Sequence, residues 1–379
     1  MIKKKETKDE EIVQHYSLEP IKKRKCRYNM IFGERSNGKT YAVLKEGIDL
    51  YLENHTCLGI IRRWDEDLRA SKGSEMFNNF IYNEETGNYI EKKTCGKWNN
   101  VKYISRKWYL VHQNEDGEID NVDPNPMAYA FALTQAEHYK SQSFPLIRTI
   151  LFDEFITRDN YLIDEFIEFM NVLSTIIRNR DDVTIYMCGN TVNKYSPYFA
   201  EMGITRVRKM QKGDIDVYQY GEEGKLRVAV EYSDFPSKKK KSDVYFAFDN
   251  PKLQMITKGE WEIQSYPHRP IPFEKYDIIY TYFIKFEEDI LQCEVVEKND
   301  MMFTFIHRKT TPIKDNPENI VYQQDYDPRP NYRRRINRPQ SELEQKIASF
   351  YSREKVFYQS NDVGEIVRNY LLWCNNQKL

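Results

Sequence analysis

The apolar positions in the first two thirds of the chain form short continuous runs that alternate with segments of helical spacing. The continuous runs predict buried strands, and apolar residues three and four apart predict amphipathic helices. Four runs are of the first kind: "RYNMIFG", "TCLGIIRR", "IRTILFDEF" and "DVTIYMCGN". Such alternation is typical of an α/β domain with a mainly parallel sheet. We expect this domain to cover residues 1–232, beginning with a polar lead-in.

Two segments have the helical pattern: "KTYAVLKEGIDLYLEN" and "LIDEFIEFMNVLSTIIRNR". In the second, six residues are expected to share one apolar face. They are Ile163, Phe166, Ile167, Met170, Leu173 and Ile177.

The last hundred residues follow a different pattern. Strand-like runs separated by short polar turns come first, and two helical segments follow, so residues 276–379 predict a compact α+β domain. Before it, "SDFPSKKKKSD" is rich in Pro, Ser and Lys, and three further prolines follow at Pro267, Pro270 and Pro272. We therefore expect a linker or small linking subdomain over residues 233–275.

A glycine-rich loop follows the first predicted strand and precedes the first predicted helix. Its sequence has the G-x-x-x-x-G-K-[ST] spacing of a phosphate-binding loop. In such a loop the lysine, here Lys39, reaches the β- and γ-phosphates, and the hydroxyl of Thr40 is a Mg²⁺ ligand. A second cation inside the loop, Arg35, is unusual. We expect the whole loop to bind the nucleotide: Gly33, Glu34, Arg35, Ser36, Asn37, Gly38, Lys39 and Thr40.

Two acids end the apolar run "TILFDEF". Asp153 fits the carboxylate that holds Mg²⁺ through water, and Glu154 fits a general base for the attacking water. Together with the loop, this pair predicts a P-loop NTPase of the additional-strand, catalytic-glutamate (ASCE) branch. The alternative is a solvated pair of acids at a strand end.

Four further residues are candidates on position or residue type. Asn190 ends the next strand, where it can sense the γ-phosphate or hold the lytic water, or simply form a turn. Arg178 and Arg180 follow the long helix, and either can be an arginine finger or a cation favoured by the helix dipole. Lys140 lies in a polar loop and, on residue type alone, is a surface lysine.

The net charge of −1 excludes a generally basic nucleic-acid coat protein. Three local basic clusters are solvated faces or contacts with a phosphate backbone: residues 22–27, Lys238–Lys241, and Arg333–Arg335 with Arg338. The six cysteines lack zinc-site spacing and predict free thiols in a reducing compartment. No run reaches the ~18 apolar residues of a membrane helix, and the charged N-terminus is no signal peptide. We expect a soluble intracellular protein.

The order of these motifs resembles that of the DNA-packaging ATPases of phi29-like tailed phages. The resemblance covers residues 28–200 and rests on the loop with Arg35 in third place, then "IIRR", "LFDEFI", "IRNR", the strand with Asn190, and "SPYF". It implies ATP as the nucleotide and a homo-oligomeric ring, expected to be a pentamer, on the portal vertex of a prohead. Each active site would be completed by a neighbouring subunit.

The resemblance also implies residue roles. The finger matches Arg178, with Arg180 as the other candidate, and Lys140 would act across the subunit interface. Arg35 would contact phosphate and couple hydrolysis to movement, in its own subunit or across the interface. The C-terminal domain would be an RNase H-like nuclease that has lost its metal site and docks to the prohead or its structural RNA.

The expected first strand of that domain bears on nuclease activity. A two-metal nuclease needs converging carboxylates. The strand "YTYFIKF" has none, and its acids, Glu287, Glu288 and Asp289, come after it. We therefore expect no nuclease activity.

The sequence thus predicts an ATP- and Mg²⁺-dependent translocase that packages double-stranded DNA into a preformed prohead. It would work in the bacterial cytoplasm, transiently at the portal vertex, and would be absent from the mature virion. The alternatives are a helicase or another ring ATPase on nucleic acid, and a non-hydrolysing nucleotide-gated adaptor. The set Lys39, Thr40, Asp153 and Glu154 argues against the adaptor.

Overall fold

The computed structural model describes residues 16–83, 86–158, 160–235 and 261–376. They fall into two compact units, divided between Trp261 and Glu262, with the short segment before Glu165 grouped with the second unit. The division lies within the expected linker 233–275. Residues 236–260 of that linker, including Lys238–Lys241, lie outside the described residues, as do residues 1–15 of the lead-in. No described helix is both long and apolar enough to cross a membrane.

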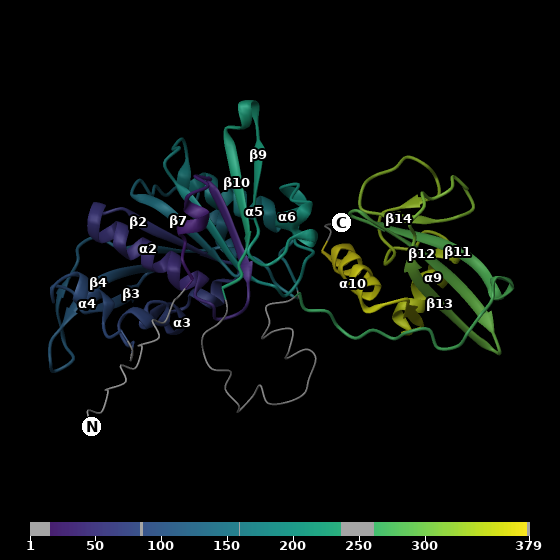
Figure 1. Cartoon of the computed structure of the whole chain (residues 1–379), viewed down its shortest axis with the longest axis horizontal. Coiled ribbons are helices and arrows are strands. Elements are labelled where there is room, and N and C mark those ends of the chain that lie inside the picture. The colour runs from purple at the N-terminus through teal and green to yellow at the C-terminus, as the bar shows by residue number, and fades with distance from the viewer. Residues whose placement is uncertain (1–15, 84–85, 159, 236–260, 377–379) are drawn as a thin grey trace, which may run out of the picture. The chain divides into compact units, whose positions relative to one another are not determined.

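Unit 1 is built on a ten-stranded sheet whose centre is parallel, as the apolar runs predicted (Figure 1). The parallel strands lie in the order β6-β2-β7-β8-β1-β10, so that β8 separates β1 from β7. Their bounds are β1 (Tyr28–Gly33), β2 (Cys57–Arg62), β6 (Ala128–Ala132), β7 (Ile147–Asp153), β8 (Thr184–Asn190) and β10 (Leu226–Tyr232). All six strands therefore end at one edge of the sheet.

Antiparallel strands extend the sheet on both sides. β9 pairs with β10, and on the other side β4 pairs with β6, β3 and β5. Their bounds are β3 (Asn100–Ile104), β4 (Lys107–Gln113), β5 (Ile119–Val122) and β9 (Ile215–Tyr220). In Figure 1 the hairpin of β9 and β10 (teal) extends beyond its neighbours.

Two long helices pack on this sheet. α2 (Lys39–Asn54) buries Val43, Leu44, Ile48 and Tyr51, and ends at His55 in a left-handed conformation. The shorter elements are α1 (Glu19–Lys22), α3 (Ala70–Glu75), α4 (Tyr89–Lys93) and α6 (Pro197–Glu201), with 3-10 turns η1 (Asp65–Leu68), η2 (Asn78–Phe80), η3 (Leu133–Tyr139), η4 (Arg206–Lys209) and η5 (Glu222–Gly224).

The second long helix, α5 (Glu165–Ile177), buries a different face from the one that the sequence predicted. Ile163 precedes the helix and Ile167 is 54% exposed, so neither belongs to a buried stripe. The buried apolar face consists of Phe169, Val172 and Ile176 together with Leu173, which is the one predicted residue that is buried. The rest of the predicted stripe was wrong because its pattern began in a segment that is not helical.

Unit 2 contains a six-stranded mixed sheet and two helices, which agrees with the α+β prediction. β11 (Ile278–Phe286), β12 (Asp289–Lys298) and β13 (Met301–Arg308) form an antiparallel meander. β14 (Val321–Gln323) pairs parallel with β11, β15 (Tyr332–Arg333) with β14, and β16 (Val356–Tyr358) with β13. A 3-10 turn, η6 (Lys275–Asp277), precedes the meander, and the helices are α9 (Glu342–Ser352) and α10 (Asn361–Asn375).

Candidate active site

The glycine loop joins the end of β1 to the first residue of α2. Gly38 has φ 94° and Ser36 has φ 59°, so the loop turns through left-handed conformations that glycine adopts easily. The N-cap residue of α2, Gly38, has no side chain to cap the first turn, although Asn37 Oδ1 accepts from Lys39 N at 3.4 Å. The N–H groups of this turn and the positive end of the helix dipole therefore suit an anion. A Cβ on Gly33 would lie 3.0 Å from the carbonyl oxygen of Ser233, a tight contact that favours glycine there.

Lys39 is buried within this loop, with 4% of its surface exposed. Its Nζ donates to the carbonyl oxygen of Glu34 at 2.7 Å and to Oδ1 of Asn37 at 2.9 Å. Burial lowers the pKa of Lys39 to about 8, against the opposing effect of Asp153 and other nearby acids. Both hydrogen-bond acceptors are neutral, so a phosphate would be a better partner for this ammonium group.

Asn37 also connects the loop to the residues that follow β10. Its Nδ2 donates to Oγ of Ser233 at 3.4 Å and to the carbonyl oxygen of Phe235 at 3.2 Å. The same side chain thus accepts from Lys39 and donates to the segment that follows β10. Arg35, by contrast, is exposed, and no ion pair or hydrogen bond of its guanidinium occurs among the described residues.

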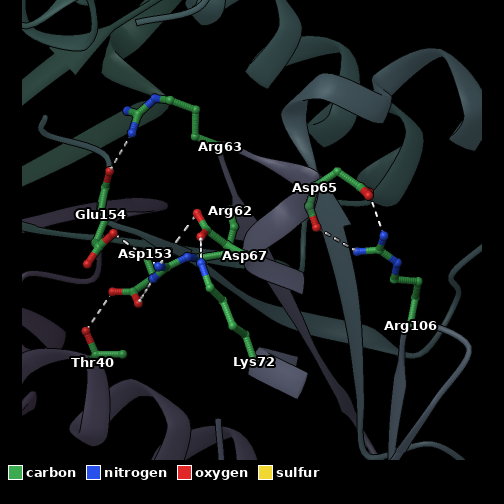
Figure 2. Close-up of polar contacts among 9 residues, drawn as sticks. All are labelled: Thr40, Arg62, Arg63, Asp65, Asp67, Lys72, Arg106, Asp153 and Glu154. Carbon is green, nitrogen blue, oxygen red and sulfur yellow. Dashed lines mark hydrogen bonds and ion pairs between the residues drawn. The ribbon is translucent and has the colours of Figure 1, made fainter. Parts of the chain in front are cut away.

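Asp153 and Glu154 lie at the end of β7, beside the start of α2 (Figure 2). Thr40 Oγ1 donates to Asp153 Oδ1 at 2.7 Å. This hydroxyl and carboxylate are the hard oxygen ligands that Mg²⁺ prefers, and their proximity fits a site in which water and phosphate supply the other ligands. The two residues predicted to hold the metal are therefore brought together.

Arg62, the last residue of β2, connects both acids. Its Nη1 lies 2.5 Å from Asp153 Oδ2, and its Nη2 lies 3.1 Å from Glu154 Oε2. Arg63 reaches the turn at Glu154 from the other side, donating from Nη1 to the carbonyl oxygen of Glu154 at 3.1 Å (Figure 2). Successive residues at a strand end point to opposite faces, which explains the two directions.

The sequence alone indicates no role for these two arginines. The stretch "IIRR" contributes only to the family resemblance, because a single sequence does not show that β2 lies next to β7. The observable signal was two cations directly after a continuous apolar run. A buried acid was also missed: Glu231 on β10 accepts a hydrogen bond from Tyr16 at 2.7 Å, and burial raises its pKa to about 7.

The other predicted residues lie around this centre. Asn190 ends β8 in register with Gly33. Arg178 follows α5 and is exposed, and its Nη2 donates to the carbonyl oxygen of Gln142 at 2.7 Å. Lys140 pairs with Glu137 on the same polar segment. The predicted finger and Lys140 are thus on neighbouring parts of unit 1.

Arg180 has a different environment from Arg178. Its guanidinium donates to five backbone carbonyl groups, and burial lowers its pKa. The acceptors are the carbonyl oxygens of Phe144, Pro145, Ile147, Ile176 and Ile177. These contacts hold the end of α5 to the segment that enters β7.

In unit 2, the acids after β11 do not form a metal cluster with their neighbours. Asp289 pairs with Arg308, which also contacts Asp362. Within residues 16–376, apart from the gaps named above, no group of three or more His, Cys, Asp or Glu side chains is placed to hold a metal. In the basic cluster, Arg333 pairs with Glu344, and Arg334 lies over the ring of Trp373.

Comparison with known proteins links this site to phage DNA packaging. Residues 14–245 match the family described as Podovirus DNA encapsidation protein (Gp16). The DNA packaging protein of Bacillus phage B103 is 25% identical over 179 residues, which are 46% of this chain and 48% of that protein. That of Bacillus phage phi29 is 26% identical over 174 residues, 45% of each. The chain thus spans about half the length of these curated relatives.

The fold has counterparts among solved structures. The chain is similar to one described as the bacteriophage Phi-29 viral genome packaging motor assembly, with a TM-score of 0.55, 19% identity, and coverage of 94% of this chain and 99% of the other. This similarity concerns the fold alone. The family match covers well over half of the 379 residues. This chain therefore belongs to the Podovirus DNA encapsidation protein (Gp16) family.

Proposed function

We propose that this protein is the ATPase subunit of a motor that packages double-stranded viral DNA into a preformed prohead. The observation that carries the proposal is the 2.7 Å contact of Thr40 with Asp153, made where the glycine loop meets β7 and beside Glu154. It joins the hydroxyl and carboxylate of a nucleotide–metal site to a candidate base. Family membership supports DNA packaging as the process that this chemistry drives.

ATP would bind with its phosphates over the loop Gly33–Thr40. Lys39 would exchange the carbonyl oxygen of Glu34 and the Asn37 side chain for phosphate oxygens, while the α2 N-terminus adds backbone donors. Thr40 and Asp153 would hold Mg²⁺, which when bound neutralises charge on the β- and γ-phosphates.

Hydrolysis requires a base near the γ-phosphate, and Glu154 is our candidate. Its carboxylate would take the proton of the attacking water, once it is no longer bound to Arg62. Asn190, beside Gly33, would orient that water or report on the γ-phosphate. Arg35 would couple hydrolysis to DNA movement, so Arg35→Ala should uncouple the two more than it weakens ATP binding.

Active sites would be shared in a homo-oligomeric ring, which we propose is a pentamer. Arg178 is the better candidate for the finger that enters a neighbour's site, because it is exposed and, among the described residues, its guanidinium donates only to the carbonyl oxygen of Gln142. Arg180 is committed to five carbonyl groups of its own subunit. Lys140 would act across the same interface.

The strand orders support a finer assignment of the fold. β8 lies between β1 and β7, as expected for the additional strand of the ASCE branch of P-loop NTPases. In unit 2, an antiparallel meander continues into parallel β14 and β15 on the side of β11, which supports an RNase H-like fold. We propose that this domain is not a nuclease and that it docks to the prohead or a structural RNA. The protein would act in the host cytoplasm and at the portal vertex only.

A phosphate-release assay with the full chain, with and without double-stranded DNA, tests the ATPase. Glu154→Gln should reduce the rate at least 10²-fold and leave binding of a fluorescent ATP analogue nearly unchanged. DNA entry into proheads, measured as DNase-protected DNA, tests the motor. Strand separation on forked DNA, without packaging, would instead indicate a helicase. Nucleotide binding without any phosphate release would indicate an adaptor.

A further inference from the structure

We propose that Arg63 is a positioning residue for Glu154: it clamps the backbone turn that aims the Glu154 carboxylate and fixes that turn to the start of α5. The inference rests on the proposed role of Glu154 as general base. It concerns a different arginine from Arg62, which contacts the two carboxylates themselves.

The Glu154 turn needs support from outside. Glu154 has φ 60°, a left-handed conformation that a non-glycine residue adopts at a cost of about 1 kcal/mol or more. Its own side chain is 60% exposed. One backbone hydrogen bond, from Phe155 N to the carbonyl oxygen of Cys188 at 3.2 Å, ties the turn to β8. The buried Phe155 ring packs against Tyr198 and Phe199, and Arg63 adds hydrogen bonds to the backbone of the turn.

The Arg63 guanidinium supplies that support through its fork of donors. Nη1 donates to the carbonyl oxygen of Glu154 at 3.1 Å, and Nη2 donates to that of Phe155 at 3.0 Å. These are the two consecutive carbonyl groups that directly follow the left-handed Cα of Glu154. Because the residue is 6% exposed, the contacts are shielded from water and hold the backbone more firmly than surface contacts would.

The other edge of the same guanidinium binds α5. Nε donates to Glu165 Oε2 at 2.7 Å, and Nη2 donates to Glu165 Oε1 at 2.9 Å, a two-point contact. The Glu165 side chain is fully buried, and Tyr198 OH donates to its Oε1 at 2.7 Å. A buried charge pair with several hydrogen bonds is costly to break from one side. The arginine is therefore held in one orientation, which is what a positioning residue requires.

The geometry makes hydrolysis sensitive to this clamp. A displacement of about 1 Å in a catalytic group can reduce a rate 10²-fold. Lysine in place of Arg63 keeps the charge for Glu165 but has three donors and no planar fork, so it cannot make the four hydrogen bonds that Arg63 makes to Glu165 and the two carbonyl groups. Arg63→Lys therefore disrupts the hydrogen bonds of the clamp while keeping the positive charge beside Glu165.

The test measures single-turnover ATP hydrolysis, affinity for a fluorescent ATP analogue, and melting temperature in the full chain with DNA. We expect Arg63→Lys to lower the hydrolysis rate about 10- to 100-fold and to change nucleotide affinity less than about twofold. Tyr198→Phe is a graded comparison, because it removes one hydrogen bond to Glu165 but keeps both hydrogen bonds from Arg63 to the turn and the ring that packs on Phe155. Its loss of hydrolysis rate should be clearly smaller than that of Arg63→Lys.

A double-variant cycle tests whether the effect passes through Glu154. With Glu154→Gln present, Arg63→Lys should cause no further loss of the residual rate. If Arg63→Lys proves unstable, the pair Arg63→Gln with Glu165→Gln replaces the buried ions by neutral groups of similar size. We expect that pair to fold and to remain slow.

Three outcomes would overturn the inference: a rate near wild type in folded Arg63→Lys, a rate near wild type in the neutral pair, or a further full loss on the Glu154→Gln background. Wild-type hydrolysis by Glu154→Gln itself is a separate result. It would contradict the proposed function rather than only the clamp.

Discussion

Arg62 Nη2 and Glu154 Oε2 lie 3.1 Å apart, so the carboxylate proposed to accept a proton from water is bound to a cation of its own subunit. The same guanidinium contacts Asp153 through Nη1. One side chain therefore contacts two acids with different proposed roles, so a substitution of Arg62 alters the contacts of both.

Arg62→Gln should raise DNA-independent hydrolysis several-fold and reduce the stimulation by DNA. The amide keeps a hydrogen-bond donor for Asp153 but releases the Glu154 carboxylate from its ion pair. Phosphate release with and without DNA measures both rates. Lys72→Gln, which alters the neighbouring pair with Asp67, serves as a control and should leave both rates near wild type. Loss of all hydrolysis in Arg62→Gln would mean instead that the arginine is needed in the reaction.

Arg178→Ala and Arg180→Ala should fail in different ways. Arg178→Ala should abolish hydrolysis by the assembled ring, spare ATP binding and leave the melting temperature nearly unchanged, because the side chain is exposed. Arg180→Ala should destabilise the protein by about 2–4 kcal/mol, since five carbonyl groups lose their donor.

Mixing subunits distinguishes the finger from a residue of its own site. Arg178→Ala subunits retain Glu154, and Glu154→Gln subunits retain Arg178, so mixed rings should recover some hydrolysis. If the mixed rings are no more active than rings of either variant alone, Arg178 does not act in a neighbour's site.

ATP affinity should fall as pH rises above about 8. Burial lowers the pKa of Lys39 to about 8, so at higher pH the unliganded lysine is neutral and must take up a proton to bind phosphate. The dissociation constant should therefore rise towards tenfold per pH unit above pH 8. Calorimetry in buffers of different ionisation enthalpy should find uptake of nearly one proton at pH 9 and little at pH 7. An affinity independent of pH from 7.5 to 9.5 would contradict this.

Glu231→Gln should stabilise the protein at pH 8 and have little effect at pH 4.5. Burial raises the pKa of Glu231 to about 7, well above the ordinary value near 4.3. The folded state then holds a proton that the unfolded state releases, so stability falls as pH rises from about 4.5 to 7. The variant should gain roughly 2–3 kcal/mol at pH 8.

Denaturant unfolding at both pH values, variant minus wild type, isolates this contribution from other titrating groups. Glutamine still offers an oxygen to the Tyr16 hydroxyl, so the hydrogen bond is kept. A difference that does not change between pH 4.5 and pH 8 would mean that Glu231 is not the group responsible.

Local motifs were predictable from the sequence, whereas most contacts between distant segments were not. Two motifs can be recognised in the sequence because residue type, spacing and a preceding apolar run occur together. They are the loop Gly33–Thr40 and the acids Asp153 and Glu154. Their 2.7 Å junction at Thr40 also followed from the parallel sheet, since strand ends meet at one edge. The roles of Arg62 and Arg63 depend on β2 lying beside β7, which the sequence does not encode locally.

One wrong prediction and one alternative that the sequence left open have physical causes. The face of α5 was misjudged because Ile163 and Ile167 continue a helical period although one precedes the helix and both are exposed. Arg178 and Arg180 look equivalent in "RNR". Only the fold reveals that Arg178 is left-handed at φ 53° and exposed, whereas Arg180 turns back onto the segment before β7.

Helix α5 has Glu165 as its first residue and Arg178 directly after its last. Thirteen helical residues span about 20 Å and behave as one rigid rod. Through Arg63, one end of the rod is attached to the Glu154 turn, while the other carries the proposed finger. Coupling of this kind is reciprocal. When Arg178 contacts the nucleotide of a neighbouring subunit, the helix would shift the position of Glu154 in its own subunit. The position of Glu154 would in turn affect how Arg178 contacts the neighbouring subunit.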